Sequence, residues 1–245
     1  MGIRRLAALV VVLVAAAIPG APDRHAPHAQ AGPVDLNLLI AVDSSYSVDN
    51  VEYELQRKGI SAAFRDPVVQ TAIADGAYGA IGVVIMQWSS SRSQLIGVSW
   101  HRVSDPVSAE AFAQAAAVMP RRMADGTTSI STALLRGADI LNDSPFLGSR
   151  MVIDIQGDGT NNDGPEPEDV RDQVISAGIT INGLTINTQL KWLHEYYADK
   201  VIGGPGAFVE VTANFKGYAE AMRRKLLREI RPPIVSQNAS RRRGA

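Results

Sequence analysis

The sequence predicts an α/β fold, with a mainly parallel central sheet of about six strands, one antiparallel edge strand, and helices on both faces. Three mainly apolar runs, at 34–42, 77–89 and 150–158, are typical of strands that are buried on both faces. Longer segments with apolar residues at helical spacing lie between the strand candidates. Strands that alternate with helices in this way form parallel sheets, so the pattern predicts the α/β class.

The first 31 residues predict an export signal. Arg4 and Arg5 precede the apolar run Leu6–Ile18, which is short for a bilayer span. The small-x-small pattern at Ala29–Ala31 suits cleavage after Ala31, while a site near Ala21 and an uncleaved anchor remain alternatives. We therefore expect a periplasmic or secreted domain over residues 32–231, with no stable membrane span after signal cleavage.

Composition narrows the choice of partners. The 24 basic and 25 acidic residues nearly cancel, which gives no indication of nucleic-acid binding. Residues 232–245, which end in "RRRGA", are expected to form a disordered basic tail. The chain has no cysteine, so neither a lipoprotein anchor nor a disulfide is available and stability must come from packing.

The first half of the predicted domain continues from the strand at 34–42 into a helix over 47–64, with Asp49 available near its start. The buried strand at 77–89 is followed after a short turn by 93–103. This segment alternates more strongly in polarity and is expected to pair antiparallel at an edge. An alanine-rich helix over 105–119 ends at Pro120.

The second half begins with a loop at 121–128 and then repeats the alternation of helices and strands. Helices are expected over 129–143, 166–178, 189–202 and 215–230, and strands over 150–158, 179–186 and 207–213. Asp154 lies inside a buried strand, where we expect a hydrogen bond to backbone or a contact with a basic side chain.

Oxygen-bearing side chains follow the predicted strands at two places and occur in one loop. Asp43, Ser45 and Ser47 follow the first strand, Asp158 ends the strand at 150–158, and Thr128 lies in the loop before a helix. Ligands of parallel sheets bind at the carboxyl ends of the strands, so these side chains are expected to meet. Thr127 is an alternative to Thr128.

Hydroxyl and carboxylate oxygens suit a hard cation, here Mg²⁺, or Mn²⁺ or Ca²⁺ in its place. Because hydroxyls are neutral, such a site leaves much of the metal charge unquenched and the ion attracts an anionic oxygen from outside. The simpler interpretation is that Asp43, Ser45 and Ser47 only form a turn that caps the next helix.

The three segments resemble the von Willebrand factor A (vWA) superfamily. The stretch "DSSYS" at 43–47 matches its D-x-S-x-S signature, Thr128 in "TSISTAL" its second-loop threonine, and Asp158 in "GDG" its third-loop aspartate. The resemblance runs from Val34 to about Ile230 and implies a Rossmann-like vWA fold. The stretches "QGDGTNNDG" and "TINGLTI…VIGGPGAFV" also resemble a bacterial family of exported single-domain proteins without assigned function.

In the vWA superfamily these residues form a metal ion-dependent adhesion site. The resemblance implies that Ser45, Ser47 and Thr128 contact Mg²⁺ directly or through one water. It also implies that Asp43 and Asp158 hold the waters of the ion and orient the hydroxyls.

The residue between the two serines departs from the superfamily pattern, which usually has glycine where this chain has Tyr46. The ring either contacts a partner or narrows access to the ion, or else the loop changes conformation and binds metal less well. The turn formed by Asn161, Asn162 and Asp163 is expected beside the metal, where together with Tyr46 it would form a partner-binding rim.

These observations predict a binding module and not an enzyme. The partner would be an unidentified protein that supplies a carboxylate to the metal. A Mg-dependent phosphohydrolase of the haloacid dehalogenase type is an alternative, but it requires a second aspartate where this chain has Ser45. No G-x-S-x-G motif or cysteine nucleophile occurs. A metal-free structural component of an envelope complex is the other alternative.

Overall fold

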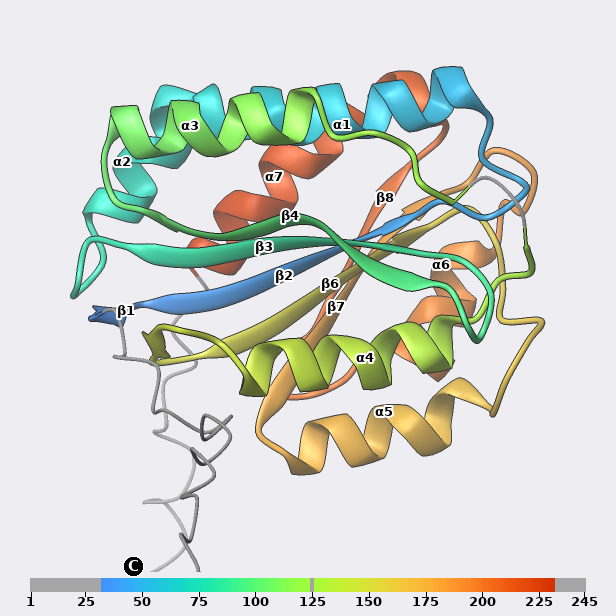
Figure 1. Ribbon diagram of the computed structural model, residues 1–245. Coiled ribbons are helices and arrows are strands. Elements are labelled where there is room, and N and C mark those ends of the chain that lie inside the picture. Colours follow the sequence, from blue (N-terminus) through green and yellow to red (C-terminus); the bar gives the residue numbers. More distant parts are fainter. Residues whose placement is uncertain (1–31, 124–125, 232–245) are drawn as a thin grey trace, which may run out of the picture.

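The computed structural model describes residues 32–123 and 126–231 (Figure 1). The predicted signal peptide at 1–31 and the predicted tail at 232–245 lie outside the described residues. A six-stranded sheet runs through the centre in the order β4-β3-β2-β6-β7-β8. Its strands are β2 (Leu36–Asp43), β3 (Ile81–Trp88), β4 (Gln94–Val103), β6 (Met151–Gly157), β7 (Ile179–Ile186) and β8 (Val209–Thr212).

The pairing of the strands confirms the predicted sheet. Only β3 and β4 pair antiparallel, and β4 forms an edge, while all other neighbours in this sheet are parallel. A separate two-stranded parallel pair, β1 (Pro33–Val34) with β5 (Leu147–Gly148), was not expected from the sequence.

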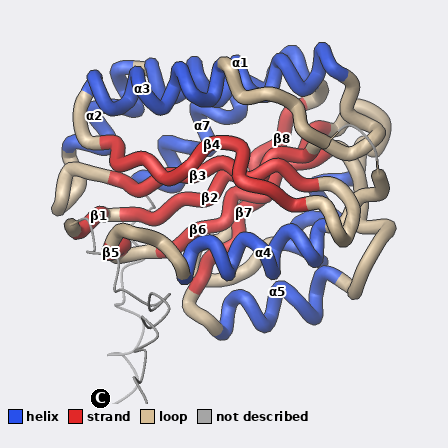
Figure 2. The backbone as a smooth tube through the Cα atoms, in the orientation of Figure 1, coloured by secondary structure: helices blue, strands red, loops and turns tan. Residues whose placement is uncertain are grey.

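Helices cover both faces of the sheet, as Figure 2 shows, with α1, α3 and α7 on one side and α4 and α5 on the other. Their bounds are α1 (Asn50–Arg65), α2 (Pro67–Ala74), α3 (Pro106–Ala117), α4 (Ile130–Asn142), α5 (Pro167–Ser176), α6 (Leu193–Tyr196) and α7 (Tyr218–Ile230). A π-helical turn (Tyr197–Val201) continues α6, and a 3-10 turn (Phe215–Gly217) precedes α7.

Strand β2 shows how the apolar pattern places the core. All eight of its residues are buried. Leu38, Ile40 and Val42 pack on the face with α1, α3 and α7, while Leu39 and Ala41 pack on the face with α4 and α5. A strand covered on both faces favours apolar residues at successive positions, which is why Leu38–Val42 is an unbroken apolar run.

Two segments differ from the expectation. Helix α2 was missed because it is short, although Asp66 caps it by accepting hydrogen bonds from the N–H groups of Val68 and Val69 at 2.7 and 3.2 Å. The single helix expected over 189–202 is replaced by α6 and the π-helical turn, with only turns before Leu193.

Asp154 has the basic partner that its burial predicts. The Nζ atom of Lys225 on α7 lies 2.7 Å from Asp154 Oδ1, and both side chains are fully buried. Within residues 32–123 and 126–231, no helix is long and apolar enough to cross a membrane.

Candidate metal centre

Four of the five side chains predicted to meet lie together at the carboxyl edge of the sheet, where the loops after β2 and β6 lie beside the loop before α4 (Figure 1). The Oγ atoms of Ser45 and Ser47 are 3.2 Å apart. Ser47 Oγ donates to Asp158 Oδ1 at 2.7 Å, and the Ser45 N–H donates to Asp43 Oδ1 at 2.7 Å. Four of the five predicted ligands thus form one hydrogen-bonded network.

The network does not cap the next helix. Asp49 does so, because its Oδ1 accepts from the Glu52 N–H at 2.8 Å while Glu52 Oε2 accepts from the Asp49 N–H at 2.9 Å. This reciprocal pair is a complete capping box. The hydroxyls of Ser45 and Ser47 therefore have no role in starting α1, and the simpler interpretation of the opening cluster does not account for them.

Asp43 is the most unusual group of the network. Burial raises its pKa to about 7, with a further increase from the charge of Asp158, and the hydrogen bonds from Ser45 oppose the shift. Its Oδ2 atom is buried and has no hydrogen-bond partner among the described residues. A buried carboxylate oxygen without a donor or cation is costly, so the fold holds Asp43 in a position that favours an added positive charge.

Gly157, the first glycine of the "GDG" stretch, makes room for this carboxylate. A Cβ atom at Gly157 would lie 2.7 Å from the Tyr197 hydroxyl and 3.1 Å from Asp43 Oδ2. Any side chain there would push into both groups, so the packing of the Asp43 carboxylate and the Tyr197 hydroxyl against this end of β6 requires glycine.

The two threonines before α4 have different environments. Thr127 Oγ1 donates to Asp163 Oδ2 at 2.7 Å. Thr128 is largely buried, and its Oγ1 lies 3.8 Å from the point where a Cβ at Gly159 would be, next to the Asp158 loop. No hydrogen bond from this hydroxyl to another described residue is present. Thr128 is therefore the threonine whose oxygen faces the third loop without being used elsewhere.

The predicted rim contains one residue that projects outward and three that brace the loops. Tyr46 is 80% exposed. Asn162 exchanges two hydrogen bonds with the backbone of Thr128, both at 2.8 Å. Asp163 Oδ2 also accepts from the Ser91 N–H at 2.8 Å. This turn fixes the threonine loop against the third loop, and its contact with a partner stays a prediction.

Asn161 braces the same turn from the other side. Its Oδ1 accepts from the Ser131 N–H at 3.3 Å, and its own N–H donates to the Tyr196 hydroxyl at 3.2 Å. The turn is thereby joined to the first turn of α4 and to α6.

Arg121 was not predicted, yet it fixes the first loop. Its guanidinium Nη2 donates to the backbone oxygens of Val48 and Ser45, the latter at 3.2 Å. Nη1 donates to Asn50 Oδ1 at 3.0 Å, and Nε donates to the Met123 oxygen at 3.1 Å. One side chain thus ties the D-x-S-x-S loop to the segment before Thr128. No motif marks this arginine in the sequence.

Within the described residues, acidic side chains alone do not form a metal site. Over 32–123 and 126–231, no group of three or more histidine, aspartate or glutamate side chains is placed to hold an ion. A cation at the carboxyl edge would therefore depend on hydroxyl oxygens together with Asp43 and Asp158.

A family model described as "Protein of unknown function (DUF1194)" matches residues 33–234. The chain belongs to the DUF1194 family. A comparison with curated proteins gives no match.

Solved structures show that this DUF1194 chain has the vWA fold. It is similar to the vWF domain of the type V pili tip protein Mfa5 from Porphyromonas gingivalis, with TM-score 0.55 and 10% identity over 79% of this chain and 94% of that one. A von Willebrand factor type A structure from Catenulispora acidiphila gives TM-score 0.52 and 18% identity over 81% and 43%.

A third similar structure is proximal thread matrix protein 1 from the mussel byssus, with a zinc-occupied MIDAS motif. Its TM-score is 0.56 and its identity 14%, over 80% of this chain and 48% of that one. The DUF1194 chain thus spans about half the length of the mussel protein.

Proposed function

We propose that this DUF1194 domain is exported, with residues 1–31 removed as a signal peptide. In the periplasm or outside the cell it would bind a partner protein through a divalent metal ion. The observation that carries the proposal is the network of Asp43, Ser45, Ser47 and Asp158, in which a buried carboxylate oxygen has no partner. Without a cation, that unpaired oxygen lowers the stability of the fold, which is expected of a group that binds a cation.

The residues present fit a hard cation. Every candidate ligand is an oxygen, which suits Mg²⁺, with Mn²⁺ and Ca²⁺ as alternatives. Ser45, Ser47 and Thr128 would contact the ion directly or through one water. Asp43 and Asp158 would hold its waters and compensate its charge. A bound ion would supply an open coordination position for a carboxylate of the partner.

The similar structures support an adhesive role. The mussel matrix protein holds zinc in its MIDAS motif, and Mfa5 is a pilus tip protein. We propose a comparable use of the metal here, with Tyr46 and the turn of Asn161, Asn162 and Asp163 as the rim that contacts the partner. The exposure of Tyr46 supports its part in this rim.

The direct test compares partner capture from envelope extract with Mg²⁺, with a chelator, and with the Asp43→Ala variant. We expect one partner to be lost on chelation and in Asp43→Ala alike. The matched control is Asp139→Ala, which removes an exposed aspartate of α4 and should retain the partner. A partner that is retained in all conditions would contradict the metal bridge.

Two further readouts separate the alternatives. Mg²⁺ or Mn²⁺ should raise the melting temperature of the chain, since a ligand that binds only the folded state stabilises it. An absent shift would favour the metal-free structural role. Metal-dependent turnover of generic phosphate esters, abolished in Asp43→Ala, would favour the phosphohydrolase.

A further inference from the structure

A cavity of about 530 Å³ lies at the edge of the sheet opposite the candidate metal centre. Its walls are the first residues of β6 and β7, the turn before β8 and the last turn of α7. Most of the lining is apolar and includes Val152, Ile175 and Phe208. This volume and this character are typical of sites for small molecules.

Glu229 brings a carboxylate into the wall of the cavity although it is only 2% exposed. Its Oε1 accepts from Asn182 Nδ2 at 3.0 Å and from Lys225 Nζ. Its Oε2 is buried and has no hydrogen-bond partner among the described residues. An unpaired buried carboxylate oxygen is costly unless something supplies a donor or a positive charge.

The buried charged groups next to the cavity include fewer ammonium groups than carboxylates. Lys225 is the only ammonium in contact with two fully or almost fully buried carboxylates, Asp154 and Glu229, within the described part of the chain. One positive charge between two negative charges leaves a deficit of one. Of the two carboxylates, only that of Glu229 belongs to a residue lining the cavity, and its Oε2 has no hydrogen-bond partner among the described residues.

Two guanidinium groups also line the cavity and have unused donors. Arg228 is stacked on Phe208, with its Cζ 3.8 Å from the ring centroid. Arg150 Nη2 donates to the Ile230 oxygen at 3.3 Å. Neither arginine forms an ion pair with a carboxylate of the described residues, so both can receive an anionic group.

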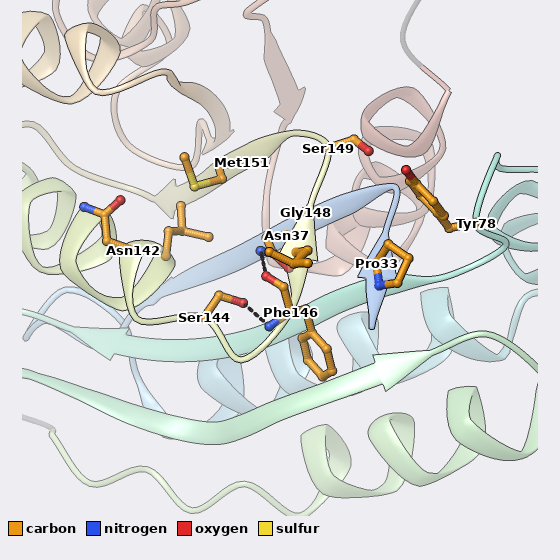
Figure 3. A pocket seen from close by; sticks show the side chains of 11 residues that line it. Pro33, Asn37, Tyr78, Asn142, Ser144, Phe146, Gly148, Ser149 and Met151 are labelled. Atoms are coloured by element: carbon orange, nitrogen blue, oxygen red, sulfur yellow. Dashed lines mark hydrogen bonds between the residues drawn. The ribbon is translucent and has the colours of Figure 1, made fainter. Parts of the chain in front are cut away.

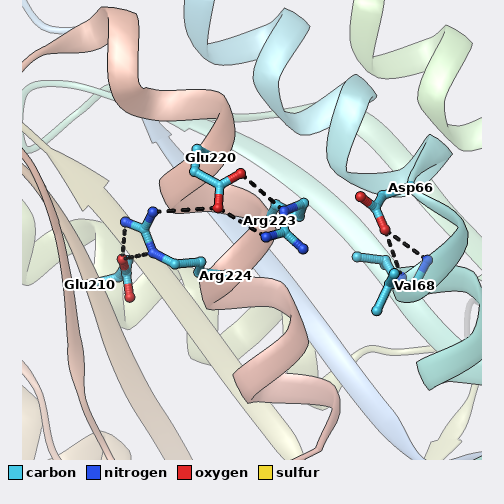
Figure 4. Close-up of polar contacts among 7 residues, drawn as sticks. Asp66, Val68, Glu210, Glu220, Arg223 and Arg224 are labelled. Carbon is cyan, nitrogen blue, oxygen red and sulfur yellow. Dashed lines mark hydrogen bonds and ion pairs between the residues drawn. The ribbon is translucent and has the colours of Figure 1, made fainter.

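Other arginines on the same helix are already paired. Figure 4 shows Arg224 bound to Glu210 and Glu220, and Arg223 bound to Glu220. The unpaired state of Arg228 is thus a property of its position at the cavity and not of α7 as a whole.

A second cavity, of about 460 Å³, has no comparable groups (Figure 3). Asn37 Nδ2 donates to the Phe146 oxygen at 3.0 Å in its wall, and none of its lining residues is charged. Only the 530 Å³ cavity of these two is lined both by a carboxylate, which could bind an ammonium group, and by guanidinium groups, which could bind a carboxylate.

We infer that this cavity binds a free α-amino acid with a large apolar side chain. Its ammonium group would lie on the Glu229 side of the cavity, its carboxylate would meet the guanidinium groups of Arg228 and Arg150, and its side chain would pack against the apolar wall. Arginine binds carboxylates through two parallel N–H groups, which gives the orientation of the ligand. The inference does not depend on the proposed metal site.

The test is calorimetric titration of the purified full chain with L-leucine, L-phenylalanine and L-tryptophan in the presence of a chelator. We expect one-to-one binding of at least one of them. For the phenyl series, phenethylamine lacks the carboxylate and 3-phenylpropanoate lacks the ammonium. Each should bind at least tenfold more weakly than L-phenylalanine, because each leaves one charged group of the cavity unpaired.

Variants then locate the site. Arg228→Gln should weaken binding at least tenfold, while the matched control Arg224→Gln on the same helix should change it less than twofold. Glu229→Gln keeps the shape of the side chain and should weaken binding of the amino acid, with its melting curve as a check that it folds. Asp43→Ala should bind the amino acid as the original chain does, which separates this site from the metal site.

Absence of binding by all three amino acids would overturn the inference. So would binding of the two analogues with the affinity of L-phenylalanine, or an unchanged affinity in Arg228→Gln.

Discussion

Asp43 and Asp154 are two aspartates on the neighbouring strands β2 and β6, and both are fully buried. Burial raises the pKa of each carboxyl above its ordinary range. Asp154 has an ion-pair partner, Lys225 Nζ at 2.7 Å, and its Oδ2 accepts from Gln156 Nε2 at 3.0 Å. Asp43 receives the Ser45 N–H on Oδ1 and nothing on Oδ2.

The difference between them lies in where the compensating charge comes from. For Asp154 it is part of the chain and arrives when α7 packs. For Asp43 no cationic side chain contacts the carboxylate in the described residues, and Asp158 adds repulsion. A buried aspartate of the first kind contributes to the fold, whereas one of the second kind prepares a site for a cation from solution.

Removing the internal cation should have the largest effect. Lys225→Met would leave Asp154 and Glu229 buried without an ammonium, and breaking a buried pair in this way costs about 3–5 kcal/mol. Denaturant unfolding measures the loss. Lys200→Met is the control, because its pair with Glu168 is partly exposed and its loss should lower stability far less. Equal losses in the two variants would contradict the distinction.

The second-largest effect should be the loss of stability on metal removal, which should depend on Asp43 and not on Asp154. With Mg²⁺ at about 100 times its dissociation constant, the metal should add about 2.7 kcal/mol to the unfolding free energy. Asp43→Asn should abolish that increment, and Asp154→Asn should retain it while lowering stability in the absence of metal. Unfolding curves with Mg²⁺ and with chelator measure both terms. A metal increment that survives in Asp43→Asn would remove the basis of the comparison.

The effect of Arg121→Met should be smaller and should appear in both stability and metal binding. The variant leaves backbone oxygens of the first loop without their donor, and unmade hydrogen bonds of this kind cost about 1–3 kcal/mol. We also expect weaker Mg²⁺ binding in titrations, because the serines lose their support. Arg136→Met removes an exposed arginine and should change neither quantity appreciably.

Tyr46→Gly should have the smallest effect on the fold. The side chain is mostly exposed, so we expect a change within about 0.5 kcal/mol, measured by denaturant unfolding. Titration with Mg²⁺ then resolves the two roles of the ring. A clearly tighter metal affinity in the variant would mean that the ring hinders access, whereas unchanged affinity with weaker partner capture would support a contact at the rim.

The strands and the meeting of the three loops could be predicted because local patterns encode them. The apolar run of β2 indicates burial on both faces. The proximity of Asp43 and Asp158 follows because the carboxyl ends of parallel strands lie at the same edge of the sheet. Asp154 likewise required a partner, and a basic one was among the two expectations.

The remaining features depend on tertiary contacts that leave no local pattern. Arg121 lies 73 residues from Val48, and no spacing rule connects them. Tyr197, the first residue of the π-helical turn after α6, has its hydroxyl beside Gly157 and near Asp43, and no local pattern in the sequence shows this. The unpaired oxygen of Glu229 could not be foreseen, because the sequence shows a glutamate at helical spacing from Lys225 and gives no sign that both are buried.

The Lys225 contacts also restrict how α7 can move. A shift of this helix by one turn, about 5.4 Å along its axis, would separate the ammonium from Asp154 and leave the buried carboxylate without its cation. Such a movement would be opposed by the cost of separating the buried Lys225 ammonium from the Asp154 carboxylate. The buried ion pair therefore fixes the register of α7 against β6.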